Sequence, residues 1–248
     1  MKKITLILGG LALGAAVLLL PCSSKASIIG SAHDFTASTN YWVGGSDIAV
    51  SHGSTNVCGE CHTIHHAQSA SAGPLFIHTP SANSTFNTYD KSGSATYSGT
   101  VITLGPGSLA CLSCHDGSVA VNSTTSWSGA GNGTASYTGG TPEFIKSSAI
   151  VTEIGSGQGN DLTHMHPIGV NYSAAASSAQ AMFGVAQLQP TANTFNAPGS
   201  PAVGSVLKNG QVECSTCHDI HRTVGGSTTS GIYTVASGQA LCLGCHIK

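Results

Sequence analysis

The sequence predicts a fold that is mostly coil, with few short helices and strands and little regular secondary structure. Only 7% of the 248 residues are charged and 6% are aromatic, whereas 32 residues are glycine. Ser, Thr, Gly, Ala and Asn fill most of the chain, and small polar residues favour turns over long helices. Because few large apolar side chains are present to form a core, we expect bound cofactors to supply part of the folding free energy.

The first 26 residues predict export. Two lysines precede an apolar run at residues 4–20, and the small residues around Ala26 offer a cleavage site that would leave Ser27 as the first mature residue. The apolar run is short and no basic flank follows it, which favours a cleaved signal peptide over a membrane anchor. Cys22 leaves lipidation open, because "LLPC" loosely matches the sequence at which bacterial lipoproteins are processed.

The charge pattern argues against a nucleic-acid partner. The formal net charge is −2, and the few charged residues are scattered along the chain. Nucleic-acid-binding domains instead carry basic patches or runs, often interleaved with aromatic residues. We therefore expect no nucleic acid among the partners.

Eight of the nine cysteines form four C-x-x-C pairs, and a histidine directly follows each pair. We number these segments motif 1 (58–62), motif 2 (111–115), motif 3 (214–218) and motif 4 (242–246). C-x-x-C-H is the attachment signature of c-type haem, in which two thioethers bind the porphyrin and the histidine binds the iron as proximal ligand. The sequence therefore predicts four covalently bound haem c groups, attached at Cys58, Cys61, Cys111, Cys114, Cys214, Cys217, Cys242 and Cys245, with His62, His115, His218 and His246 as proximal ligands.

Three other uses of C-x-x-C pairs explain these motifs less well. Two pairs could form a tetrahedral zinc site, but four cysteine ligands need no histidine after each pair. A disulfide framework would suit an exported chain, yet it also leaves the histidines unexplained. A thioredoxin-like redox centre would need a single C-x-x-C on a βαβ scaffold.

The supply of ligands indicates six-coordinate irons with two histidines each. Eight histidines remain after the proximal ones, whereas only two methionines follow Met1. Histidine–methionine coordination raises the reduction potential, so its scarcity indicates low-potential, bis-histidine haems. A six-coordinate iron has no open coordination position for a substrate, which favours an electron-transfer protein over an enzyme.

Five histidines are candidates for the distal positions, for which four are needed. His65 and His221 each follow a proximal histidine by three residues, so they lie one helical turn away and can only bind the iron of a different haem. His166 precedes a proline that restricts its backbone. The candidates are His65, His78, His166, His221 and His33, whereas His52, His66 and His164 are expected to be spectators.

The four motifs form two unlike pairs, which indicates duplication of a two-haem unit. Motifs 1 and 3 read C-x-x-C-H-x-I-H, whereas motifs 2 and 4 read C-L-x-C-H. We therefore predict one haem-organised tetrahaem domain at residues 27–248, built from a first module at about 27–120 and a second module at about 160–248. Residues 117–210 should form loops and short strands, with a short helix at 174–188.

The chain resembles the exported multihaem cytochromes with doubled C-x-x-C-H motifs, and it is most similar to the OmcE-type tetrahaem proteins that form extracellular filaments. The resemblance rests on segments that occur in the following order: "AHDF", "VCGECHTIHHA", "PLFIH", "ACLSCHDGS", "HPIGVNY", "VECSTCHDIH" and "ALCLGCH". The chain departs from commoner family forms at Ile64 and Ile220, where proline is frequent, and at Phe76 and Ile77, where a tryptophan–asparagine pair is usual.

The resemblance implies bis-histidine haems in a near-continuous chain and a homopolymer at the outer cell surface or outside the cell. In related filaments, the histidine that corresponds to His65 binds a haem of the next subunit. Other cytochromes and extracellular electron acceptors would be the partners. Two alternatives stay open: a monomeric periplasmic or cell-surface electron shuttle, and a multihaem reductase, against which the surplus of histidine ligands argues.

Overall fold

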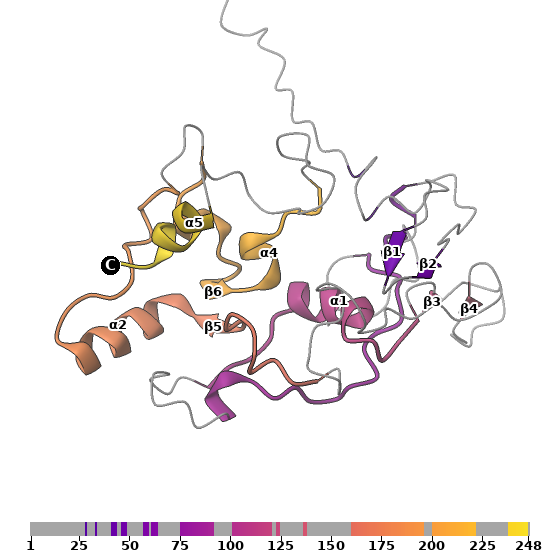
Figure 1. The fold of residues 1–248 in the computed structure, drawn as a ribbon, viewed down its shortest axis with the longest axis horizontal. Coiled ribbons are helices and arrows are strands. Elements are labelled where there is room, and N and C mark those ends of the chain that lie inside the picture. The colour runs from indigo at the N-terminus through magenta and orange to yellow at the C-terminus, as the bar shows by residue number, and fades with distance from the viewer. Residues whose placement is uncertain are drawn as a thin grey trace, which may run out of the picture.

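The computed structural model gives this chain sparse regular structure, as the sequence predicts (Figure 1). Short helices and two-residue or three-residue strands are separated by coil throughout the part of the chain that the structure describes. The prediction of a mostly coil fold is therefore confirmed. The structure describes residues 28, 33, 41–43, 46–48, 57–59, 61–63, 75–91, 101–120, 123–124, 136–137, 160–195, 200–221 and 238–247.

Within these residues the helices are short and the strands pair only with one neighbour each. The helices are α1 (Pro106–His115), α2 (Tyr172–Phe183), α3 (Val203–Val206), α4 (Cys214–Cys217) and α5 (Gly238–Cys245), with a 3-10 turn η1 (Tyr89–Lys91). Three antiparallel pairs consist of β1 (Tyr41–Val43) with β2 (Ser46–Ile48), β3 (Ser123–Thr124) with β4 (Ser136–Tyr137), and β5 (Val170–Asn171) with β6 (Gln211–Val212). None of the described helices is long and apolar enough to cross a membrane.

The longest of these helices, α2, covers most of the segment at 174–188 for which the sequence predicts a helix. It begins two residues earlier, because the side chain of Asn171 caps it by accepting a hydrogen bond from the Ala174 N–H at 2.9 Å. It ends at Phe183, because Gly184 adopts a left-handed conformation with φ of 74°. The predicted helix is thus present but shorter at its C-terminal end.

Two small hydrophobic clusters form the core of the described residues. The first contains Phe86, Leu112, Leu162 and Ile168, and the second contains Tyr172, Phe195, Val203 and Val206. Cys214 borders the first cluster and Cys245 borders the second. Each cluster therefore supports at least one of the helices that carry the C-x-x-C-H motifs.

The two predicted modules pack against each other. Leu162 and Ile168, from the start of the second module, lie in one cluster with Leu112 of α1. Helices α1 and α4 also lie side by side in the centre of the molecule (Figure 1). Motifs 2 and 3, which these helices carry, therefore meet where the modules join.

A glycine inside motif 4 is required by packing. A Cβ atom at Gly244 would lie 2.0 Å from Cδ1 of Phe195, which is fully buried in the second cluster. Asn193 also donates a hydrogen bond from Nδ2 to the Gly244 carbonyl at 2.9 Å. The aromatic ring and α5 therefore approach each other more closely than any larger residue would allow.

We predict that Gly244→Ala destabilises the protein by about 1–3 kcal/mol, the usual cost of overpacking a core. Thermal unfolding of the purified protein, followed by circular dichroism, would measure the change. Gly107→Ala is the matched control, because a Cβ there would meet only Ser215 Oγ at 3.5 Å. The control should change stability by less than about 1 kcal/mol, and in the stabilising direction, since alanine suits a helix better than glycine. Equal effects of the two variants would contradict this account of Gly244.

Candidate functional site

Each C-x-x-C-H motif folds as one helical turn that ends at its histidine. The histidine N–H donates to the carbonyl of the first cysteine at 2.9 Å in motif 1, 3.0 Å in motif 3 and 2.8 Å in motif 4, and motif 2 lies within α1. Residues three and four apart share one face of a helical turn. Both cysteines and the histidine of a motif can therefore address one bound group.

The cysteines of motifs 2 and 3 touch each other at the junction of the two modules. A hydrogen bond between the Cys111 and Cys214 side chains, together with burial, raises the pKa of Cys111, and the same hydrogen bond lowers the pKa of Cys214. The two side chains are therefore close to each other in the fold.

The remaining cysteine contacts place the motifs next to one another in sequence order. Burial raises the pKa of Cys114 to about 12, and the proximity of Cys61 adds to that shift, so motif 1 lies beside motif 2. Burial raises the pKa of Cys245 to about 11, with a further contribution from Cys217, so motif 4 lies beside motif 3. With the proximity of Cys111 and Cys214, each motif therefore lies beside the next one in the sequence.

Three of the proximal histidines each face a second histidine from a distant part of the chain. His62 faces His221 with ring centroids 6.3 Å apart, and His115 faces His33 at 6.1 Å. His246 faces His166 at 6.2 Å. Each facing residue is one of the five distal candidates, and each pair is separated by tens of residues in the sequence.

The shared separation of these pairs fits two imidazoles on opposite sides of one metal ion. A metal–nitrogen distance of about 2.0 Å, plus about 1.1 Å from nitrogen to ring centre on each side, gives about 6.2 Å between ring centres. The angles between the ring planes differ widely, at 25°, 54° and 68°. Phe76 and His78 also lie 6.2 Å apart and cannot share a metal ion, so the pairing of each proximal histidine with a second histidine, and not the distance alone, fits a shared iron.

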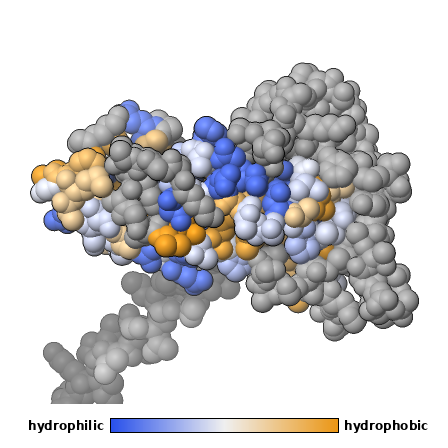
Figure 2. Space-filling view, turned by 90° about the horizontal axis from the view of Figure 1, so that it is seen from below, coloured by the Kyte–Doolittle hydropathy of each residue, from blue (hydrophilic) through white to orange (hydrophobic). Residues whose placement is uncertain are grey.

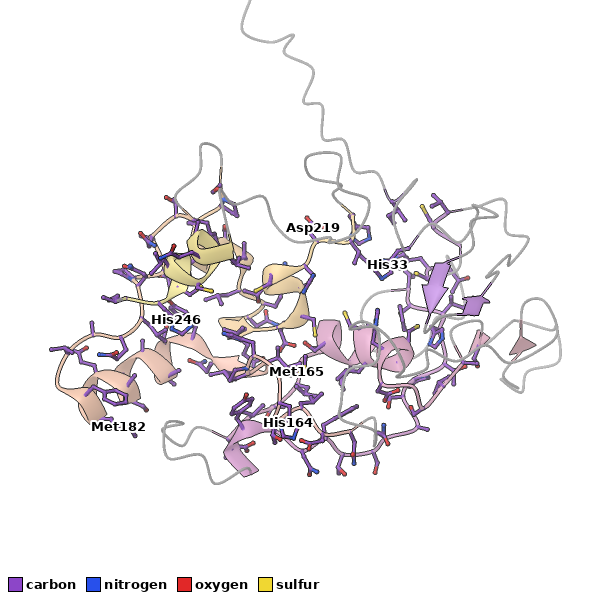
Figure 3. All side chains as sticks on the ribbon, in the orientation of Figure 1. His33, His164, Met165, Met182, Asp219 and His246 are labelled. Carbon is purple, nitrogen blue, oxygen red and sulfur yellow. The ribbon has the colours of Figure 1, made fainter. Side chains whose placement is uncertain are left out.

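His33 is prepared for metal binding by its surroundings. Burial, together with the nearby histidines His115, His218 and His221, lowers its pKa to about 4. Its ring is therefore neutral at physiological pH, which is the form in which histidine binds a metal ion. One of these neighbours is His218, the proximal histidine of motif 3. It therefore lies close to His33, which is labelled in Figure 3.

His166 is oriented by its own backbone. Its Nδ1 lies 3.0 Å from the carbonyl oxygen of Pro167, and a carbonyl can only accept, so Nδ1 carries the proton. The lone pair is then on Nε2, and such a hydrogen bond is the usual partner of a metal-binding histidine. Burial lowers the pKa of the facing His246, with a further contribution from His166.

His78 has a different environment from the three facing histidines. It is buried, and its Nδ1 and Nε2 lie 2.8 Å and 2.9 Å from the carbonyl oxygens of Thr79 and Ala120. This arrangement holds the strand-like segment at 75–79 against the chain that follows α1. It suits a hydrogen-bonding role, and the predicted ligand role of His78 stays a prediction.

Of the other histidines, the structure describes His164, which is expected to be a spectator, and that expectation stays a prediction. His164 is largely exposed and its Nε2 lies 3.5 Å from a carboxylate oxygen of Asp161 (Figure 3). The distal candidate His65 and the expected spectators His52 and His66 lie outside the described residues. The role of His65 therefore also stays a prediction.

Three polar residues beside the motifs are not evident from the sequence. Asp116 directly follows His115 and is buried, accepting hydrogen bonds from Ser118, Asn83 and Ser81. Tyr172 donates its hydroxyl to the carbonyls of Gln189 and Cys245, at 2.8 Å and 3.1 Å. Glu213 is buried where motifs 2 and 3 meet. Each is adjacent in sequence or space to a motif, but only the fold reveals its burial and contacts.

Comparison with known proteins supports the interpretation of these motifs. The family model for the doubled CXXCH motif matches residues 205–248, which include motifs 3 and 4. No curated protein matches the chain. The match supports covalent haem c binding and electron transfer, as in multihaem c-type cytochromes. Its donor set, two thiols and a histidine on one helical turn with a second histidine opposite, fits haem c.

We predict that His221→Ala exposes one iron, because the imidazole that faces His62 is lost. The absorption spectrum should gain a high-spin contribution from one haem, while the other haems remain low-spin. Added imidazole should restore the low-spin spectrum by filling the vacated position.

His164→Ala is the matched control, since His164 is exposed and interacts with Asp161. The control should leave the spectrum unchanged. A fully low-spin His221→Ala variant, or a high-spin signal in the control, would show that the facing pairs are not axial ligands.

Proposed function

We propose that this chain is a tetrahaem electron-transfer protein in which each iron has two histidine ligands. The observation that carries the proposal is the common separation of 6.1–6.3 Å in three histidine pairs, each containing one proximal histidine. Haem iron supplies one-electron chemistry, and bis-histidine coordination keeps its potential low. Because distal histidines occupy the open positions, the residues favour electron transfer over catalysis.

The arrangement of the motifs supports transfer along the molecule. The contacts between Cys61 and Cys114, between Cys111 and Cys214, and between Cys217 and Cys245 keep consecutive motifs adjacent. His221 of the second module faces His62 of the first, so one module completes the site of the other. The two modules therefore act as one electron-transfer unit.

We further propose that the exported chain is the subunit of an extracellular filament that carries electrons to external acceptors. The resemblance to OmcE-type proteins supports this, as does an exposed apolar surface beside motif 4. Figure 2 shows hydrophobic side chains at the end of the molecule that carries α2. This surface contains Met182, Phe183, Val185 and Ile247, which are 39–61% exposed. Contiguous exposed apolar residues commonly mark sites of protein association.

In this filament His65 would bind a haem iron of the adjacent subunit. A monomeric periplasmic or cell-surface shuttle is the alternative, in which the same apolar surface would meet a partner cytochrome. Low charge and small side chains suit both forms.

Negative-stain electron microscopy of the holo-protein from the extracellular fraction distinguishes the two forms. We expect thin, regular filaments in the wild-type sample. Dispersed particles of monomer size, with every iron low-spin, would contradict the filament and favour the shuttle.

A His65→Ala variant tests the proposed link between subunits. We expect loss of filaments together with one high-spin haem per chain, because the same residue would serve assembly and ligation. His66→Ala is the matched control, since His66 is its neighbour and an expected spectator. A His65→Ala variant that assembles with all irons low-spin would contradict the intersubunit role.

A further inference from the structure

We propose that Glu213 is a fixed negative charge that lowers the reduction potentials of the two haems held by motifs 2 and 3. This inference rests on the proposed function. Glu213 is 2% exposed and directly precedes the first cysteine of motif 3. Glu213 lies where motifs 2 and 3 meet. Its carboxylate can therefore help to position both motifs and also place a negative charge beside them.

The carboxylate of Glu213 joins two segments that are more than a hundred residues apart. Gly105 donates its N–H to Oε1 at 2.9 Å, and the Ser108 hydroxyl donates to Oε2. Both donors belong to the start of α1, which carries motif 2. A Cβ at Gly105 would lie 2.6 Å from Oε1, so a larger residue there would displace the carboxylate.

The hydrogen bonds at the Glu213 side chain are all directed at its carboxylate oxygens. Ser108 Oγ accepts the Cys214 N–H at 3.0 Å, so the hydroxyl hydrogen is directed at the carboxylate. Gly105 is the N-cap of α1, and the partial positive charge at a helix N-terminus stabilises a carboxylate. These contacts come from neutral groups, so they stabilise the negative charge without cancelling it.

This charge acts on the cysteines of both motifs. The pKa of Cys111 is raised by its hydrogen bond to Cys214 and by burial, and Glu213 raises it further. Glu213 also counteracts the lowering of the Cys214 pKa that the same hydrogen bond causes. Haems attached at these two cysteines would therefore both lie within the field of Glu213.

The direction of the effect follows from electrostatics. Reduction of a ferric haem adds one electron and removes one positive charge, so a nearby carboxylate stabilises the oxidised form. A buried charge acts through a lower effective dielectric constant and is screened less by salt than an exposed one. The two haems at the junction should therefore have lower potentials than they would without Glu213.

Glu213→Gln removes the charge and keeps the side-chain shape and the acceptor for the Gly105 N–H. In a spectroelectrochemical titration of the holo-protein, two of the four haem transitions should shift to higher potential. The other two should stay within experimental error. Unchanged transitions, or an equal shift of all four, would overturn the proposal, whereas the proposed function would still stand if all haems remained attached and low-spin.

Asp90→Asn is the matched control, because it makes the same change of charge at a side chain whose described contacts lie away from the motifs. Asp90 accepts hydrogen bonds from Thr88 and from the Ile102 N–H. No haem transition should shift in this control. A shift equal to that of Glu213→Gln would mean that net charge, and not the position of Glu213, sets the potentials.

Infrared difference spectroscopy tests the same proposal if Glu213→Gln fails to bind its haems. Isotope-labelled glutamate would be incorporated into a Glu60→Gln variant. This substitution removes the glutamate inside motif 1 and leaves Glu213 intact. We expect a glutamate carboxylate band to change when the haems of motifs 2 and 3 are reduced. No change in any glutamate band would overturn the proposal.

Discussion

The spacing between facing imidazole rings is the constraint on which the rest of the structure depends. An iron with two histidine ligands requires both rings on one axis, and the three described pairs come from segments far apart in the sequence. His33 reaches across to His115, and His221 reaches from the second module to His62. Each pair therefore links two segments of a chain that has little other regular structure to hold them together.

The protein part of the fold is small, and it is concentrated at the motifs. Two clusters of four buried hydrophobic residues each border a motif cysteine, and Tyr172 donates to the carbonyl of Cys245. Phe195 packs closely against Gly244, and the Glu213 carboxylate lies close to Gly105. The small hydrophobic core thus orients the cysteines and histidines of the motifs, and coil segments connect the motifs.

The sequence predicts the chemistry of the sites better than their geometry. The four motifs, the sparse secondary structure and the helix at α2 follow from local signals, namely spacing, composition and small helix-compatible residues. The partners of the histidines do not, because any of several distal candidates could reach a given iron. The hydrogen bonds of His78 to two carbonyls and the burial of Glu213 also depend on tertiary contacts. The sequence segment "VECSTCH" contains Glu213 but gives no sign that its carboxylate lies at the start of α1.

The central claim is that each iron lies between two histidines, so electron paramagnetic resonance of the fully oxidised, assembled wild-type protein tests it most directly. Quantified against the protein concentration, the spectrum should contain four low-spin ferric haems per chain and no high-spin iron. Fewer than four haems, or a substantial high-spin fraction, would contradict the account.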